Sequence, residues 1–99
     1  MNTVARIKLK RQHMYIVNNS DSVYKDSIRV RTYEHANAIF SEKKKAKIYH
    51  YHTGALAADR ERNDELDKIS YLFYHMADLG RCEIFQKKIH KDYHYFCRY

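Results

Sequence analysis

The sequence predicts an α+β domain in two layers, with a mostly antiparallel sheet of about five strands and two helices on one face. Short segments with alternating apolar and charged residues recur along the chain, and two segments with helical spacing interrupt them. A chain of 99 residues without an internal repeat or linker fits one domain, residues 1–99. The closest standard arrangement is a split βαβ, or ferredoxin-like, fold that ends in a C-terminal β-hairpin.

The first strands are predicted from a period of two. Over residues 3–17, cations alternate with aliphatic side chains, and residues 13–17 either continue the first strand or form its hairpin partner. The polar residues 18–22 predict a loop. Residues 27–32 form a further strand, in which Ile28 and Val30 alternate with two arginines.

Helical spacing follows. Thr32 can cap a helix whose apolar residues recur at spacings of three and four, with Lys43–Lys45 at its C-terminal end. Residues 47–52 return to strand character. Residues 55–79 are predicted to form one long helix, closed by Gly80 and rich in acidic residues near its start.

The C-terminal hairpin is predicted from residues 81–89 and 93–99. A turn centred on Ile89 and His90 places Cys82 opposite Cys97 and Ile84 opposite Tyr95. We expect two buried thiols, because two cysteines are too few for a disulfide framework; a cross-strand disulfide is the alternative. The absence of a long apolar stretch predicts a cytoplasmic protein without a membrane span or secretory signal.

Charge is distributed unevenly along the chain. The net charge is +7, but residues 1–54 carry 11 basic and 4 acidic residues, whereas residues 55–80 carry 3 and 6. If the aliphatic side chains of the strands face the helices, their cations form a basic plate on the other face of the sheet. Such a plate favours a polyanionic partner, although charged strand residues are also typical of a solvated sheet face.

The leading functional hypothesis is therefore a non-enzymatic protein that binds RNA or single-stranded DNA. Cations would hold phosphates while neighbouring rings stack on bases. The predicted phosphate contacts are Arg6, Lys8, Lys10, Arg29, Arg31, Lys43, Lys44, Lys45, Lys87 and Lys88. The candidate stacking residues are Tyr49, Tyr51, Tyr93 and Tyr95. No motif of a known nucleic-acid-binding module specifies a sequence or a type of nucleic acid.

A protein-binding function is the main alternative. An inhibitor or host-takeover factor of a phage or other mobile element could block a nucleic-acid-processing enzyme. It could place its basic surface in the nucleic-acid channel of the enzyme, or use Asp64, Glu65 and Asp67 as a phosphate mimic. The edge strand Val4–Leu9 could also pair with a second copy in a homodimer.

Histidine chemistry provides a further alternative. His50 and His52, two residues apart on a strand, could act with His94 and Lys47 in a metal-independent ribonuclease, or could bind zinc with His75, His90 or His94. Because no sequence spacing fixes these groups relative to one another, we assign no catalytic residue, metal or cofactor.

Overall fold

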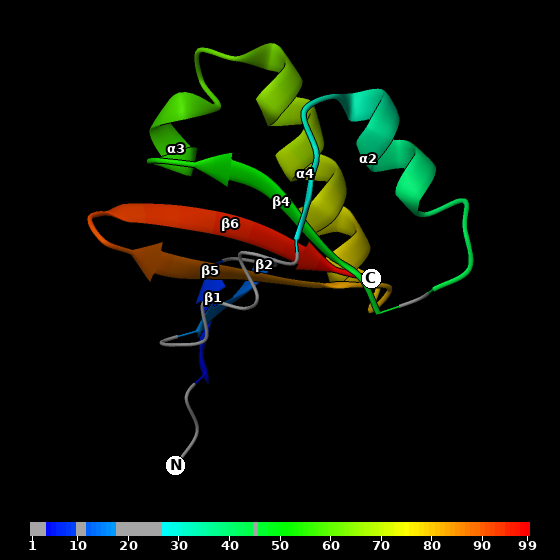
Figure 1. Cartoon of the computed structure of the whole chain (residues 1–99), viewed down its shortest axis with the longest axis horizontal. Helices are drawn as coiled ribbons and strands as arrows, with labels where there is room; N and C mark the ends of the chain where they lie inside the picture. Colours follow the sequence, from blue (N-terminus) through cyan, green and yellow to red (C-terminus); the bar gives the residue numbers. More distant parts are fainter. Residues whose placement is uncertain (1–3, 10–11, 18–26, 45) are drawn as a thin grey trace.

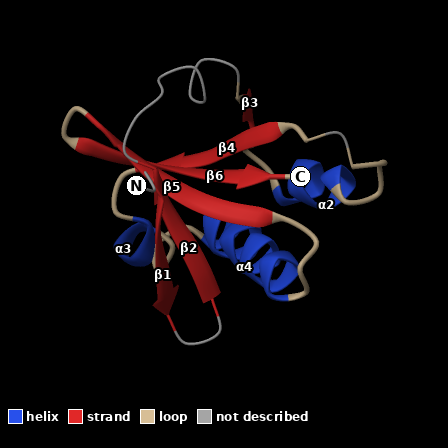
Figure 2. Ribbon diagram, turned by 90° about the horizontal axis from the view of Figure 1, so that it is seen from below, coloured by secondary structure: helices blue, strands red, loops and turns tan. Residues whose placement is uncertain are grey.

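The computed structural model describes the backbone of residues 4–9 and 12–17, and all atoms of residues 27–44 and 46–99. In these ranges, six strands form one sheet in the order β1-β2-β5-β6-β4-β3. The strands are β1 (Val4–Leu9), β2 (Gln12–Val17), β3 (Ile28–Arg29), β4 (Ile48–Thr53), β5 (Glu83–Ile89) and β6 (Asp92–Arg98). The helices α2 (Tyr33–Ile39), α3 (Leu56–Asp59) and α4 (Asp64–Asp78) cover one face of the sheet (Figures 1 and 2). The predicted α+β class, helix-covered face and C-terminal hairpin are confirmed.

The sheet is mixed, and its topology differs from the ferredoxin-like order. Within the described residues, β2 pairs with β5 and β3 with β4 in parallel, while the other three pairings are antiparallel. A ferredoxin-like chain places two consecutive strands between its helices. Here only β4 separates α2 from α3 and α4, so β3-α2-β4 is a single parallel βαβ unit.

The N-terminal strands form a hairpin. Strand β2 runs antiparallel to β1, with Leu9 opposite Gln12 and Val4 opposite Val17. Of the two alternatives for residues 13–17, the hairpin partner is therefore correct. Strand β1 lies at one edge of the sheet, as predicted for Val4–Leu9, and β3 lies at the other edge.

Helix α2 begins as predicted but ends early. The Thr32 hydroxyl accepts a hydrogen bond from the His35 N–H at 3.1 Å, which confirms the N-cap. The helix ends at Ile39, and Phe40 packs edge-on against Tyr99 at 4.9 Å between ring centroids. Lys43 and Lys44 lie beyond the last helical turn, so their predicted place at the helix C-terminus is wrong.

The predicted helix over residues 55–79 is interrupted. Asn63 adopts an extended conformation, and its side chain accepts the Leu66 N–H at 3.1 Å, which starts α4 as a separate helix. The preceding turn α3 buries Leu56. Helix α4 ends as predicted: Gly80 has φ +75°, and the Arg81 N–H bonds to the Met76 carbonyl at 2.9 Å in a Schellman motif.

The register of the C-terminal hairpin differs from the prediction by two residues. His90, with φ +60°, and Lys91 form the turn, so Ile89 is opposite Asp92 and Cys97 is opposite Ile84. Cys82 and Cys97 are both buried free thiols, as expected, but they do not form the predicted directly opposed pair. Helix α4 packs over this hairpin and β4, burying Phe73 against Tyr51 at 4.8 Å between centroids.

Gly80 offers a clean test of the α4 C-cap. A Cβ atom at this position would meet no atom within 4 Å, so Gly80→Ala adds only the strain of a left-handed backbone. We expect a loss of about 1 kcal/mol in the free energy of unfolding, measured by urea denaturation. Gly80→Asn should lose less, because asparagine tolerates this conformation. Equal losses for both variants would contradict this explanation.

Candidate functional site

A β-bulge in β4 separates two histidines that the sequence places together. His50 is opposite Phe96 and His52 is opposite Tyr95, so Tyr51 is an additional residue in β4. The predicted common face for His50 and His52 is wrong, because the bulge turns His52 toward the helices. There its Nε2 lies 2.8 Å from the Asp59 carboxylate at the end of α3.

His50 instead forms a buried cluster with a second histidine. On the face away from the helices, its Nε2 lies 3.2 Å from His94 Nδ1, and the Thr53 hydroxyl lies 3.2 and 3.1 Å from these two nitrogens. Arg29 of the neighbouring strand donates from Nη1 to His50 Nδ1 at 3.2 Å. These four residues are called the histidine network here.

Donor chemistry fixes the protonation of this network. Arginine only donates, so His50 Nδ1 must be an acceptor, and the proton of the neutral His50 ring is on Nε2. That proton is donated to Thr53 or His94. A nitrogen that binds a metal ion needs a free lone pair. Because His50 Nε2 carries the proton while Nδ1 accepts from Arg29, Nε2 cannot bind a metal ion in this arrangement. Residues 27–44 and 46–99 hold no group of three or more His, Cys, Asp or Glu side chains that could bind a metal ion.

Burial keeps the two imidazole rings of the network neutral. The pKa of His50 is lowered to about 4, first by burial and then by the nearby Arg29 and His94. Burial also lowers the pKa of His94, while Asp92 opposes this effect. At neutral pH, neither ring supplies the protonated imidazole that the ribonuclease alternative needs as a general acid. Lys47, the other predicted member of that alternative, lies at the start of β4 and pairs its backbone with Tyr99.

The described centre of the sheet carries buried side chains on the face away from the helices; of the strand cations predicted to form the basic plate, only Arg29 and Arg31 have described side chains, and both are exposed. The centre of the face away from the helices contains Phe96 and Phe85, stacked at 5.1 Å and 0% and 3% exposed. Lys87 is 2% exposed, so its predicted role as a phosphate contact is wrong. Arg6 and Lys8 lie on β1, where the structure describes only the backbone. Lys10 and Lys45 lie outside the described residues.

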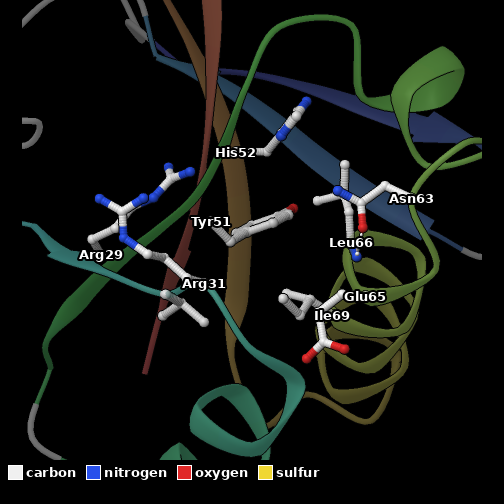
Figure 3. A pocket seen from close by; sticks show the side chains of 9 residues that line it. Arg29, Arg31, Tyr51, His52, Asn63, Glu65, Leu66 and Ile69 are labelled. Carbon is white, nitrogen blue, oxygen red and sulfur yellow. Dashed lines mark hydrogen bonds between the residues drawn. The ribbon is translucent and has the colours of Figure 1, made fainter.

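Exposed cations remain at the β3 edge of the sheet. Arg29 and Arg31 are exposed, whereas Val30 between them is buried, and in Figure 3 both guanidinium groups lie on the side of the sheet edge away from α4. The predicted alternation therefore holds from Arg29 to Arg31 but fails at Ile28, which is 37% exposed at the start of the edge strand. Lys43 and Lys44 are exposed after α2, and Lys88 is exposed beside the Tyr93 ring, 5.7 Å from its centroid.

Three of the four candidate stacking tyrosines lie in the core. Tyr49, Tyr51 and Tyr95 are 6%, 2% and 8% exposed, so they cannot stack on bases without unfolding. Tyr93 is 39% exposed and remains a candidate. Two other exposed tyrosines, Tyr33 and Tyr71, were not predicted; Tyr71 stacks on His75, four residues along α4.

The acidic residues proposed as a phosphate mimic lie on the first turn of α4. Asp64, Glu65 and Asp67 are exposed. Glu65 also accepts the Tyr33 N–H at the start of α2, and Asp67 pairs with Arg60 at 2.7 Å. Two of these three carboxylates therefore help to hold the helices together.

A small pocket lies between β3, β4 and the start of α4. Its volume is about 90 Å³, and its lining comprises Arg29, Val30, Arg31, Tyr51, His52, Asn63, Glu65, Leu66 and Ile69 (Figure 3). The side chains come from the carboxyl ends of two parallel strands and the N-terminus of a helix. Several of these residues were predicted as site residues, but for separate roles: Arg29 and Arg31 as phosphate contacts, Tyr51 as a stacking ring, Glu65 as a phosphate mimic and His52 in the histidine alternatives. Their meeting in one pocket was not predicted, because it depends on the break at Asn63.

Comparisons with known proteins give no relative: no protein-family model, curated protein or solved structure matches this chain. No helix in the described ranges is long and apolar enough to cross a membrane.

The histidine network should make stability depend on pH. The unfolded state binds a proton on His50 near pH 6.5, whereas the folded state does so near pH 4. The stabilisation by neutral His50 is therefore complete above pH 6.5. As the pH falls toward 4, the free energy of unfolding decreases by about 3 kcal/mol on this account. Urea denaturation of His50→Gln should show a weaker dependence over this range. His75→Gln, on the exposed side of α4, is the control; an unchanged profile for His50→Gln would contradict the assignment.

Proposed function

We propose that this protein binds single-stranded nucleic acid, without catalysis, along the β3 edge of its sheet. The observation that supports this proposal is the pair of exposed guanidinium groups of Arg29 and Arg31 on that edge (Figure 3). These two residues are called the basic edge here. Lys43, Lys44 and Lys88 would add phosphate contacts beyond it.

Neighbouring arginines suit a phosphate backbone. A guanidinium group offers planar donors that match phosphate oxygens in a bidentate geometry, and an anion relieves the repulsion between two adjacent cations. The hydrogen bond to His50 already restricts the Arg29 side chain, so this side chain loses less conformational entropy when a ligand binds.

A single strand fits this surface better than a duplex does. Tyr33 is 36% exposed and follows Arg31 by two residues, so a ring lies close in sequence to the proposed phosphate contacts. Stacking on such a ring requires unpaired bases and contributes about 1 to 3 kcal/mol per base.

We place the protein in the cytoplasm, where a reducing environment keeps thiols such as Cys82 and Cys97 free.

Replacing Arg31 tests the basic edge. Arg31→Ala should weaken binding to single strands of different sequence to a similar extent and lower the slope of log affinity against log salt by about 0.7, the value for one phosphate contact. Arg62→Ala, at an exposed arginine between α3 and α4, is the matched control. Filter binding over a salt series measures both. Failure of the wild-type protein to retain RNA or DNA at low salt would overturn the proposed function.

A protein partner is a second candidate, supported by the outer side of α4. Tyr71 and Leu79 are 65% and 59% exposed, which is unusual for large apolar side chains, and they follow the acidic first turn. Reversing the charge at Asp64, or replacing Tyr71 with alanine, should then weaken binding of a captured protein partner without changing the affinity for nucleic acid. A pull-down with and without nuclease separates the two candidates, because retention that nuclease abolishes contradicts this one.

A further inference from the structure

The pocket beside the basic edge lies where the parallel strands separate. Val30 still bonds to β4, its N–H donating to the His50 carbonyl at 2.9 Å, but the chain then leaves for α2. The start of α4 closes the opposite side of the gap (Figure 3). Ligands of sheets with parallel strands commonly bind outside the carboxyl ends of those strands, at such a separation.

A buried hydroxyl points into this pocket. Tyr51 is 2% exposed, and its hydroxyl has no hydrogen-bond partner within the part of the chain that the structure describes. Figure 3 shows the hydroxyl end of the ring directed toward Asn63 and Leu66, across the pocket. A buried hydroxyl without a partner costs about 1 to 3 kcal/mol, so a ligand that bonds to it recovers this free energy.

The lining favours a small hydroxylated group. The pocket has the volume of about three water molecules, which is too little for a whole nucleotide. The Asn63 side-chain oxygen already accepts the Leu66 N–H, which leaves its amide protons as donors. One Glu65 carboxylate oxygen accepts the Tyr33 N–H, and the other is an acceptor at the pocket lining. A carboxylate that accepts from a ribose hydroxyl is a frequent device in nucleotide sites.

A phosphate group does not suit the interior of the pocket. The carboxylate of Glu65 would repel it, and the guanidinium groups of Arg29 and Arg31 point away from Tyr51, toward the outside of the sheet (Figure 3). The arrangement therefore separates a cationic rim, which suits phosphate, from an interior that suits an uncharged sugar.

We propose that this pocket receives the 2′-hydroxyl edge of one ribose, with the Tyr51 hydroxyl as its hydrogen-bond partner, so that the protein prefers RNA to DNA. The inference rests on the proposed binding of nucleic acid at the basic edge and specifies the substrate class.

Tyr51→Phe tests this proposal, because it removes the hydroxyl and keeps the ring. The probes are single-stranded RNA and DNA of identical uracil-containing sequence, which differ only at the 2′ position. We expect the wild-type protein to bind the RNA about tenfold more tightly, and Tyr51→Phe to bind both with the affinity of the wild-type protein for DNA. RNA methylated on its 2′-oxygen should bind the wild-type protein no better than DNA does.

Tyr95→Phe is the matched control. The Tyr95 hydroxyl is also buried but accepts the Leu56 N–H at 3.4 Å, so its loss should lower stability without changing the ratio of RNA to DNA affinity. Tyr51→Phe should leave the thermal stability of the free protein equal or higher, since no protein hydrogen bond is lost. A fall in stability with an unchanged affinity ratio would show a purely structural hydroxyl and overturn the proposal.

The outcomes also separate this inference from the proposed function. Equal affinity of the wild-type protein for RNA and DNA, with the expected loss for Arg31→Ala, overturns the ribose site and leaves nucleic-acid binding intact. Absence of binding to either probe overturns both.

Discussion

The additional residue in β4 determines how the polar residues of this domain are sorted between the two faces of the sheet. Without the bulge, strict alternation would place His50 and His52 together and direct Thr53 toward the helices. With it, Tyr51 fills the core beside Phe73, His52 reaches Asp59 of α3, and Thr53 lies next to His50. Tyr51 would face the helices in either case, so the bulge changes the positions of His52 and Thr53: it sends His52 to the pocket side and completes the histidine network with Thr53 on the other face.

The histidine network connects the interior of the sheet to the basic edge. His50 is neutral because it is buried, and its neutral ring is what allows Nδ1 to accept a hydrogen bond from Arg29. Protonation of His50 would remove this acceptor and place two cations side by side. The position of the Arg29 side chain on β3 is therefore coupled to the burial of the His50 ring on the neighbouring strand β4.

Local signals in the sequence identified several elements correctly. Thr32 precedes a helical segment and caps it, Gly80 ends α4 in a left-handed conformation, and the alternation from Arg29 to Arg31 matches the exposure of these residues. Each of these features depends on a few neighbouring residues, so the sequence is sufficient to predict it.

Features that depend on distant contacts could not be predicted in this way. A tyrosine suits either face of a sheet, since its ring favours burial and its hydroxyl favours water; only the packing of Tyr51 and Tyr95 beneath α4 decides the outcome. Asn63 is favoured at an N-cap over a helix interior, but the acidic and apolar residues on both sides of it also suit one continuous helix, and the burial of Leu56 in α3 accompanies the break. The burial of Lys87 could not be predicted either, because it depends on what packs over the sheet and not on the place of this residue in an alternating strand.

The opposite charges on either side of the pocket restrict how a polyanion could lie on this molecule. Arg29 and Arg31 form one rim, whereas Glu65 and the first turn of α4 form the other. A phosphate backbone that crossed the pocket toward α4 would leave the cations and approach Asp64 and Asp67. A strand bound as proposed would therefore run along β3, where the cations lie. The net charge of +7 is consequently less informative than its division, because the acidic rim would repel the same polyanion that the basic edge would attract.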